Sequence, residues 1–575
     1  MKKQLRMSER RSLVDGLAAE LATTLKREQV AAYSLYQTVA TPDVFQNHVI
    51  ATTKKYKSCA TSVQHLADKA ILGFKQNVER LKSFDPQLPA FSRDRRQKLS
   101  SLSHRDVRLY RARAWCAFLL GSGPSAEEVF SAAKHGSGTT LGLKYSFCNL
   151  EDKWTYPLSC TPRVKRLFPC YEAFDKGLSE SIEIFNRLSD KAKYCVNTGS
   201  RLTTVDKDDT KDRVICIEPT LNMFFQQGLM HVMTSRLKSL GYDLTQKQFD
   251  HRRLALVGSL TGSLATVDFS MASDCCLLSV CRFLLPQGWF EWLMEVRCDT
   301  CTYKGEELSL PMMSSMGNAT TFPLETVLFL SLALACDDYP GGVMPTLKDD
   351  TFARFSVFGD DCILPTHLAP VFMELCESVG FLVNKDKSFF GTERFRESCG
   401  VDAYRYHNVR SFYIRAPADC RTRTLLSWCY TLFNRALKTA RNAVGPLLAI
   451  YVFHDSFALI LRFMKDLGVR VHLVPEYFPD DAGIHLDDPR TLLFIRSNQL
   501  KMQTISADRH GTFNFSFHSW KYPKSSRYDR LHYFVGLKKC RDLEEGSYIH
   551  RRNGRYVESN MGFSAHVSWN EGWFT

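Results

Sequence analysis

The sequence predicts an α+β fold organised around a split β-α-β-β-α-β unit in the middle of the chain. Residues 264–267 are apolar, which indicates a short buried strand. Residues 352–364 are apolar and β-branched on both sides of Gly359, which indicates a β-hairpin with Asp360 and Asp361 at its tip. Apolar segments of helical length lie between the strand and the hairpin and again after the hairpin. This order of elements is that of the split unit.

Two acids far apart in the sequence are expected to meet in such a unit. Asp268 directly follows the first strand, and Asp360 lies at the hairpin tip. A carboxylate at the end of a buried strand carries a desolvation cost unless it is paired or bound to a metal. Hard divalent cations prefer oxygen ligands, so the pair indicates a metal site. An Asp-Asp pair alone is weak evidence, because the chain has five others and most such pairs lie in solvated turns.

The remaining elements follow from apolar spacing and from turn residues. The segment after Asp274 is expected to be helical and to break at Pro286, and Gly380 is a natural helix stop. The chain beyond residue 418 is helix-rich to about residue 465. Strand character is predicted for residues 213–217, and helices are predicted for residues 12–30, 276–294, 322–336 and 368–379.

Composition limits the class of protein. A chain of 575 residues is expected to form two to four subdomains. The formal net charge of +14 indicates a polyanionic partner, with solubility alone as the alternative. The nineteen cysteines have no framework spacing, and no apolar leader is present at the N-terminus, which favours a reducing cytoplasm. The longest apolar run, residues 327–336, is too short to span a bilayer.

Basic and glycine-rich segments suggest contacts with phosphate. Residues 93–113 and 521–555 combine Lys and Arg with aromatic rings, which suits an RNA-binding track or a solvated surface. Lys207, Lys211 and Arg213 bind a triphosphate or form a charged surface loop. The segments 121–124 and 134–142 are phosphate-binding loops or flexible linkers, and neither fits the Walker pattern.

Several ordered motifs resemble those of template-directed polymerases with a right-hand fold. They are Asp268-x5-Asp274, Ser315-Met316-Gly317-Asn318, Gly359-Asp360-Asp361 and a trailing lysine. More narrowly, the chain resembles the replicase subunit of positive-strand RNA bacteriophages, the levivirus group. Further stretches that carry this resemblance are residues 218–223, 262–268, 395–400 and 412–414. The resemblance is dense from about residue 200 to 417 and looser elsewhere.

Two positions depart from the family pattern. Phe358 stands before the Gly-Asp-Asp sequence where most relatives carry Tyr, so the ring is kept and the hydroxyl is lost. Activity is nevertheless expected to persist. Lys211 is offset from the position of the family's cation, unlike Lys207 and Arg213.

The resemblance implies a right-hand polymerase with fingers, palm and thumb, the palm being the split unit. It places the N-terminal region and fingers in residues 1–200. Residues 201–260 continue the fingers with a basic segment through which NTPs arrive. The palm with the catalytic motifs occupies residues 261–417, and the thumb and a basic C-terminal region occupy residues 418–575.

The activity implied is RNA-directed RNA polymerisation, which replicates a viral positive-strand RNA from NTPs without a primer. Nucleotidyl transfer would use two Mg²⁺ ions, for which Mn²⁺ can substitute. The implied metal ligands are Asp268, Asp360 and Asp361, with Lys387 as general acid. The implied substrate-binding residues are Lys207 and Arg213 for the triphosphate, and Asp274, Ser315 and Asn318 for the ribose. Gly317 completes this substrate-binding set.

The implied partners are template and product RNA and NTPs, together with host elongation factors Tu and Ts and a ribosomal small-subunit RNA-binding protein. The implied location is the cytoplasm of the bacterial host, without a membrane. Two other functions remain open. A reverse transcriptase shares the carboxylates and the fold, although its turn usually carries a bulkier residue than Gly359. A non-catalytic, basic RNA-binding or scaffold protein would use the same acids only for structure.

Overall fold

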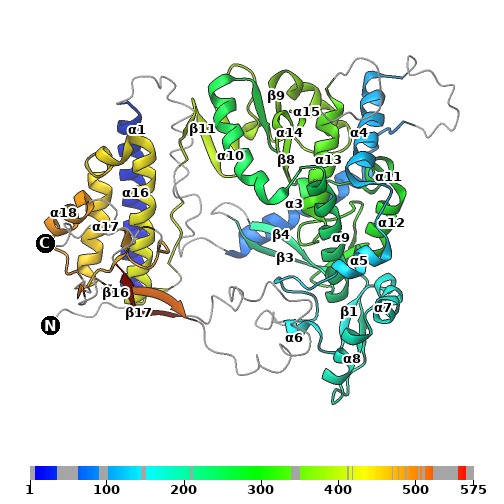
Figure 1. Cartoon of the computed structure of the whole chain (residues 1–575), viewed down its shortest axis with the longest axis horizontal. Helices are drawn as coiled ribbons and strands as arrows, with labels where there is room; N and C mark the ends of the chain where they lie inside the picture. The colour runs from blue at the N-terminus through cyan, green and yellow to red at the C-terminus, as the bar shows by residue number, and fades with distance from the viewer. Residues whose placement is uncertain are drawn as a thin grey trace.

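A computed structural model of the chain describes residues 7–34, 63–89, 102–143, 150–207, 212–337, 350–410, 413–417, 419–468, 470–474, 476, 478–485, 489–502, 506–507, 512–521 and 555–564. Lys211, residue 412, most of the predicted basic segment 521–555 and the first part of 93–113 lie outside these described residues. Helices and strands are mixed throughout, which confirms the α+β class (Figure 1).

The central sheet has the topology predicted for the split unit. Strands β5 (Leu264–Val267), β9 (Asp361–Pro365) and β8 (Ser356–Phe358) are antiparallel and lie in the order β5-β9-β8. The segment 382–389 takes the place of a fourth strand on the other side of β5. It is joined there by two isolated bridges, Thr266 with Phe389 and Phe269 with Val383. The final strand of the predicted unit is therefore reduced to these bridges.

Helices cover both faces of this sheet. On one face lie α13 (Thr321–Ala335) and α15 (Ala369–Ser378), and on the other lies α10 (Leu244–Thr261). Helix α13 is apolar on all sides, and nearly every residue in it is buried, because α4 (His104–Leu120) and α9 (Thr220–Ser239) enclose it further. The predicted apolar helix 322–336 is thus a core helix.

The predicted hairpin begins later than its apolar pattern suggests. Residues 352–354 were expected to continue the strand, but α14 (Thr351–Arg354) is one helical turn and β8 starts at Ser356. The reason is tertiary. The Phe352 ring packs against Tyr242 with the ring centroids 4.9 Å apart. The Tyr242 hydroxyl donates to the carbonyl of Val357 and accepts from its N–H, so this side chain satisfies part of the edge of β8.

A second sheet lies beside the central one. Its order is β4-β3-β6-β7, and β4 contains the predicted strand 213–217. Helix α3 (Val63–Ser83) packs on β3 and β4. The bounds of these strands are β3 (Ser200–Asp206), β4 (Asp212–Ile217), β6 (Thr300–Tyr303) and β7 (Glu306–Ser309).

The other elements of this larger body surround the two sheets. They are α5 (Ala126–Ala132), α6 (Leu150–Lys153), β1 (Leu158–Cys160), α7 (Pro162–Phe174), α8 (Lys176–Phe185), β2 (Tyr194–Val196), α11 (Leu278–Leu284), α12 (Gln287–Val296), β10 (Phe395–Ser398), β11 (Val401–Tyr404) and β12 (His407–Asn408). The break between α11 and α12 falls at Pro286, as predicted. None of the helices in the described parts of the chain combines the length and apolarity needed to cross a membrane.

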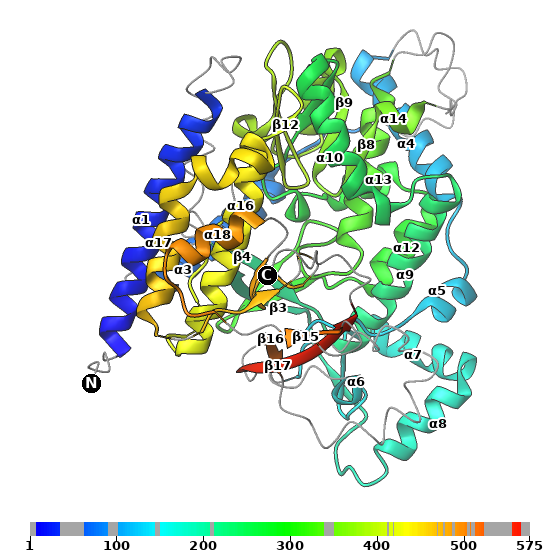
Figure 2. The same cartoon turned by 60° about the vertical axis from the view of Figure 1, so that its left-hand side comes forward.

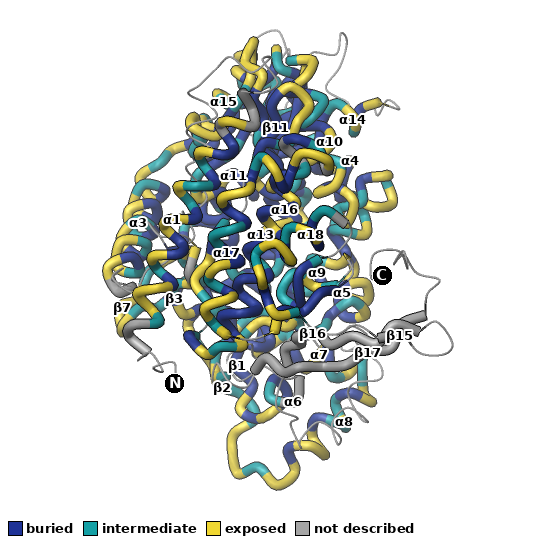
Figure 3. Tube along the Cα trace, turned by 90° about the vertical axis from the view of Figure 1, so that its left-hand side faces the viewer, coloured by how far each residue is buried: buried dark blue, intermediate teal, exposed yellow. Residues whose placement is uncertain are grey.

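The C-terminal helices form a separate apolar cluster that includes the first helix of the chain. Helix α1 (Met7–Ser34) packs along α16 (Thr422–Val452) and α17 (His454–Asp466), as Figure 2 shows. Buried and exposed residues alternate along α1, with Val14, Leu21 and Leu25 on its buried side (Figure 3). The amphipathic helix predicted at residues 12–30 is confirmed, but no pattern in the sequence indicated its partner.

Three small elements near the end of the described chain add apolar residues to this cluster: β13 (Leu473–Val474), β14 (Ile484–His485) and α18 (Pro489–Ser497). A three-stranded sheet of β15 (Ser506–Ala507), β16 (Thr512–Lys521) and β17 (Arg555–Ser564) contacts β13 and α16.

A buried carboxylate joins α1 to α17. Glu28 accepts hydrogen bonds from the N–H groups of Asp455 (2.8 Å) and Ser456 (3.3 Å) and from the Ser456 hydroxyl. These N–H groups lie in the first turn of α17, where helical amides have no partner within the helix. Glu28 therefore caps a helix that follows it by more than four hundred residues.

We expect Glu28→Ala to loosen the contact between α1 and α17 by about 1–3 kcal/mol, because buried donors lose their acceptor. Hydrogen exchange of the α1 and α17 amides measures this opening locally. Glu20→Ala is the matched control, since Glu20 is exposed on the same helix. Equal exchange rates in the two variants would show that the cap contributes nothing.

Candidate active site

A cleft of about 560 Å³ opens at the end of β5, where the two sheets and α3 face one another. It collects residues that are distant in the sequence and that the motifs singled out. These are Lys207, Arg213, Asp268, Asp274, Asp360, Asp361 and Lys387.

The carboxylates meet because of the strand register. Val267 is paired with Cys362, so Asp268 and Asp361 take the next positions on neighbouring strands. Asp360 lies in the turn between β8 and β9. Burial raises the pKa of Asp268 to about 7, and the negative charges of Asp360 and Asp361 add to this rise. The register and the turn thus bring the three acids to one end of the sheet.

The turn that carries Asp360 requires glycine. Gly359 has φ 65°, and a Cβ added to it would lie 2.9 Å from the Phe322 ring. Its N–H donates to the Thr326 hydroxyl on α13 at 3.0 Å. The Phe358 ring packs edge-on against Phe322, with the centroids 4.7 Å apart, so the missing tyrosine hydroxyl is not needed to hold this ring.

Hydrogen bonds orient the carboxylates at the two strand ends. Asn384 donates to Asp268 Oδ2 at 2.7 Å. Asp361 Oδ2 accepts from the N–H of Cys399 at 3.2 Å and faces its thiol at 3.4 Å. Burial and the charge of Asp360 raise the pKa of Asp361 to about 6 despite these bonds.

Asp360 differs from its neighbours because its side chain is reached by solvent from the cleft. Enclosure by the surrounding protein still raises its pKa. The positive charges of Arg213, Lys207 and Lys387 oppose this rise. The cleft thus holds negative charge on the strand ends and positive charge on the β3–β4 hairpin and at Lys387.

Asp274 reaches the cleft from the 3-10 turn Ala272–Asp274. Its carboxylate accepts from the N–H of Met316 at 3.3 Å, and burial raises its pKa to about 7. Asn77 on α3 donates to the main-chain carbonyl of Asp274 at 2.8 Å. An acid held in this way has an oxygen available to a ligand hydroxyl.

The loop that carries Ser315, Gly317 and Asn318 lies behind the cleft surface, and only Met316 from this loop lines the cleft. Asn318 Oδ1 accepts from the N–H of Thr320 at 2.9 Å and from its hydroxyl at 2.7 Å, so this side chain organises the start of α13. Ser315 is buried. The role of this loop in ribose recognition stays a prediction.

Close packing explains why residue 317 is a glycine. It has φ 113°, and a Cβ on it would lie 2.1 Å from the carbonyl oxygen of Cys216. The N–H of Cys216 donates to the Met316 carbonyl at 2.8 Å, which brings the loop against β4. Glycine is needed here because two backbones approach closely.

A family comparison agrees with this geometry. The model of the family described as RNA replicase, beta-chain, matches residues 15–437, which is most of the chain. This chain belongs to the RNA replicase beta-chain family. The resemblance to phage replicases is therefore confirmed.

Named relatives of this chain include two phage proteins. It is 36% identical over 316 residues to the RNA-directed RNA polymerase subunit beta of Escherichia virus Qbeta, covering 54% of this chain and 50% of the relative. It is 34% identical over 291 residues to the RNA-directed RNA polymerase beta chain of Escherichia phage MS2, covering 51% of each chain. The aligned part is thus only about half the length of these relatives.

Among solved structures, the RNA-dependent RNA polymerase of a human picorbirnavirus is similar at 16% identity and a TM-score of 0.32, over 47% of this chain and 57% of that chain. A likeness this low carries no argument about function.

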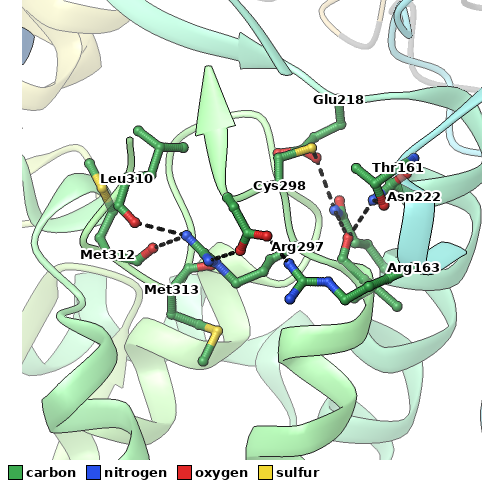
Figure 4. Close-up of polar contacts among 12 residues, drawn as sticks. Thr161, Arg163, Glu218, Asn222, Arg297, Cys298, Leu310, Met312 and Met313 are labelled. Carbon is green, nitrogen blue, oxygen red and sulfur yellow. Dashed lines mark hydrogen bonds and ion pairs between the residues drawn. The ribbon is translucent and has the colours of Figure 1, made fainter. Parts of the chain in front are cut away.

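A buried polar network supports the segment that leads into the Met316 loop (Figure 4). The Arg297 guanidinium donates to the carbonyls of Leu310 (3.0 Å), Met312 (2.9 Å) and Met313 (3.2 Å), which lead into the loop. Asp299 pairs with this guanidinium and with Arg163 on α7. An arginine can hold several carbonyls at once because its donors form a planar fork.

Glu218 and Gln226 continue this network toward the loop. Gln226 donates to Glu218 at 3.1 Å and accepts from the N–H of Ala319 at 3.3 Å. The Cys298 thiol donates to the same Glu218 carboxylate at 3.1 Å, and burial raises the pKa of Glu218. Residues 218–223 carry part of the family resemblance, and the structure gives Glu218 a supporting position outside the cleft.

Several residues of the cleft were not identified from the sequence. Helix α3 contributes Lys69 and Gly73 opposite β4, although this helix lies outside the dense motif region. Asn384, Glu397 and Arg410 also line the cleft. Asn384 lies three residues before Lys387. Glu397 lies within a stretch that carries the family resemblance, and Arg410 lies near another. Whether each of these residues lines the cleft depends on the direction of its side chain, which a sequence pattern does not predict.

The carboxylates of the cleft fit the coordination that magnesium prefers. Among the described residues, no group of three or more His, Cys, Asp or Glu side chains lies close enough to hold a metal ion alone. Mg²⁺ usually takes one or two protein carboxylates and completes its coordination with water and substrate phosphates. Asp268, Asp360 and Asp361 supply carboxylate oxygens to one cleft, which matches that mode.

Cation binding to this chain should tighten as the pH rises. A carboxyl loses its proton before it coordinates a cation, and the pKa values of Asp268 and Asp361 are raised to about 7 and about 6. Between about pH 5 and pH 8 the affinity for Mn²⁺ should therefore increase, with protons released on binding. Calorimetry in buffers of different ionisation enthalpy measures both quantities. The exposed Asp350→Asn should keep this dependence, whereas a pH-independent affinity in the unaltered chain would contradict the assigned ligands.

Proposed function

We propose that this chain is an RNA-directed RNA polymerase subunit that replicates a viral positive-strand RNA from NTPs without a primer. The cleft is the main support for this function, because Asp268, Asp360 and Asp361 face Arg213 and Lys387 in it at the end of the central sheet. The family supports this function, because its named relatives in phages Qbeta and MS2 are RNA-directed RNA polymerases.

In this proposal the chain has the divisions of a right-hand polymerase. Residues 261–417 form the palm, which contains the split unit and the acids. Residues 1–200 and 201–260 form the N-terminal region and the fingers, with the β3–β4 hairpin beside the cleft. Residues 418–575 form the thumb and the basic C-terminal region, and α1 packs against the thumb helices.

Asp268 and Asp360 would hold two Mg²⁺ ions, with Asp361 in support and Mn²⁺ as a substitute. When bound, these ions lower the charge on the triphosphate and favour ionisation of the attacking 3′-hydroxyl. Asn384 and Cys399 hold two of the three carboxylates in fixed directions, so little reorganisation is needed.

The remaining groups act on the nucleotide. Lys207 and Arg213, both accessible on the β3–β4 hairpin, would bind the triphosphate. Lys387 would donate a proton to the departing pyrophosphate. Asp274 would accept a hydrogen bond from the ribose 2′-hydroxyl, with the adjacent loop of Ser315, Gly317 and Asn318 supporting that contact.

We also propose that the chain works within a larger complex in the cytoplasm of a bacterial host. Template and product RNA are its first partners, and the formal net charge of +14 suits them. The beta-chain name of its family and relatives supports further subunits. By family resemblance these are elongation factors Tu and Ts and a ribosomal small-subunit RNA-binding protein.

We expect Asp360→Asn to lower the rate of nucleotide addition by about a hundred- to a thousandfold, because one charge that holds the metal ions is removed. Primer-extension on a defined RNA template measures this rate. Asp350→Asn, at an exposed acid next to α14, should leave it unchanged. Full activity in Asp360→Asn would overturn the site, and RNA binding without any extension by the unaltered chain would favour a scaffold protein.

Asp274→Ala should reduce the preference for NTPs over dNTPs by on the order of a hundredfold, because a site built for a hydroxyl rejects analogues that lack it. The loss should appear in kcat/KM for NTPs, while the low efficiency with dNTPs stays nearly the same. An unaltered chain that prefers dNTPs would instead be a reverse transcriptase.

A further inference from the structure

The hairpin formed by β10 and β11 reaches into the cleft beside the acids. Its turn, Cys399-Gly400, lines the cleft, and so does Glu397 on β10. The strands pair with Glu397 opposite Asp402. Through Cys399 this hairpin already orients Asp361.

Strand β10 is attached firmly to β5. Arg396 is fully buried and donates through Nε to the carbonyl of Leu264, the first residue of β5. The N–H of Glu397 donates to the Thr266 hydroxyl at 3.3 Å. Glu397 is therefore held at a fixed position relative to the strand that ends at Asp268.

The hairpin turn is also attached on its other sides. The N–H of Cys399 donates to Asp361 at 3.2 Å, and Arg252 on α10 donates to the Cys399 carbonyl at 3.2 Å. Ser398 is hydrogen-bonded to the buried His251 of α10 at 2.9 Å. One short strand thus takes its position from both β5 and the Gly-Asp-Asp turn.

Glu397 uses this fixed position to hold a flexible cation. Lys387 Nζ lies 3.0 Å from Glu397 Oε1. The Lys387 side chain is 45% exposed and that of Glu397 is 19% exposed, so the lysine is the mobile partner. A lysine has a long flexible stem, and its ammonium group has no preferred direction of its own.

We propose that Glu397 is a positioning residue for Lys387, keeping its ammonium group in the cleft where the departing pyrophosphate forms. This inference rests on the proposed function. A partly exposed ion pair contributes little to folding, so an effect on catalysis can be separated from an effect on stability. Restricting an otherwise mobile proton donor raises the fraction of time that it spends in a productive position.

A double-mutant cycle in the full chain, isolated with any host subunits that accompany it, tests this inference. Glu397→Gln should lower kcat for single-nucleotide addition by about tenfold and leave KM for the NTP within about twofold. Lys387→Met should lower kcat at least as much. The double variant should be no slower than Lys387→Met, because Glu397 acts only through that lysine.

Glu374→Gln provides the matched control, since Glu374 is an exposed acid on α15 outside the cleft, and it should behave as the unaltered chain. If Glu397→Gln does not fold, as judged by its melting temperature, Glu397→Asp takes its place in the cycle, with an intermediate kcat expected from its shorter reach.

An unchanged or raised kcat in Glu397→Gln overturns the inference. So does a double variant in which the fold-loss of kcat equals the product of the two single losses. Either result in a chain that polymerises RNA leaves the proposed function standing. An unaltered chain without any RNA polymerisation overturns the proposed function and this inference with it.

Discussion

The gathering of three carboxylates in one cleft at the end of the central sheet is the constraint on which this structure depends. Antiparallel pairing of β5 and β9 places Asp268 and Asp361 at neighbouring strand ends, and the Gly359 turn adds Asp360. Burial and like charge raise the pKa of Asp268 and of Asp361. The fold opposes this cost with directed hydrogen bonds and with the cations of the facing hairpin, but a divalent cation would relieve it most fully.

The surrounding elements hold the three carboxylates in that arrangement. Nearly every residue of α13 is buried, and the helix bonds to the Gly359 turn through Thr326, so the turn rests on a rigid base. Tyr242 satisfies the edge of β8, and β10 joins β5 through Arg396. Rigid supports on both sides of the sheet keep charged groups in place without cost at the moment of reaction, which is how preorganised sites stabilise transition states.

Local patterns predicted the strands of the central sheet well because these strands are short, apolar and bounded by strong turn residues. They failed where tertiary contacts override propensity. The contact of Phe352 with Tyr242 accompanies a helical turn where a strand was expected. The motif residues Ser315 and Asn318 are buried behind the cleft, where Asn318 accepts hydrogen bonds from Thr320 just before α13. Lys69 gave no signal, and Glu397 stood out only as part of the family stretch 395–400, because their places in the cleft depend on elements brought from elsewhere in the chain.

The amino-acid sequence alone determined the fold class, the split unit and the acids placed at the strand ends, since these follow from local periodicity and turn residues. It indicated the family through the resemblance of its ordered motifs. Only the tertiary structure decided which distant groups meet. It joined Glu28 to the first turn of α17, α3 to the wall of the cleft, and Glu397 to Lys387. The physical reason is that side-chain contacts between elements depend on packing angles and on side-chain direction, which no periodicity along the chain encodes.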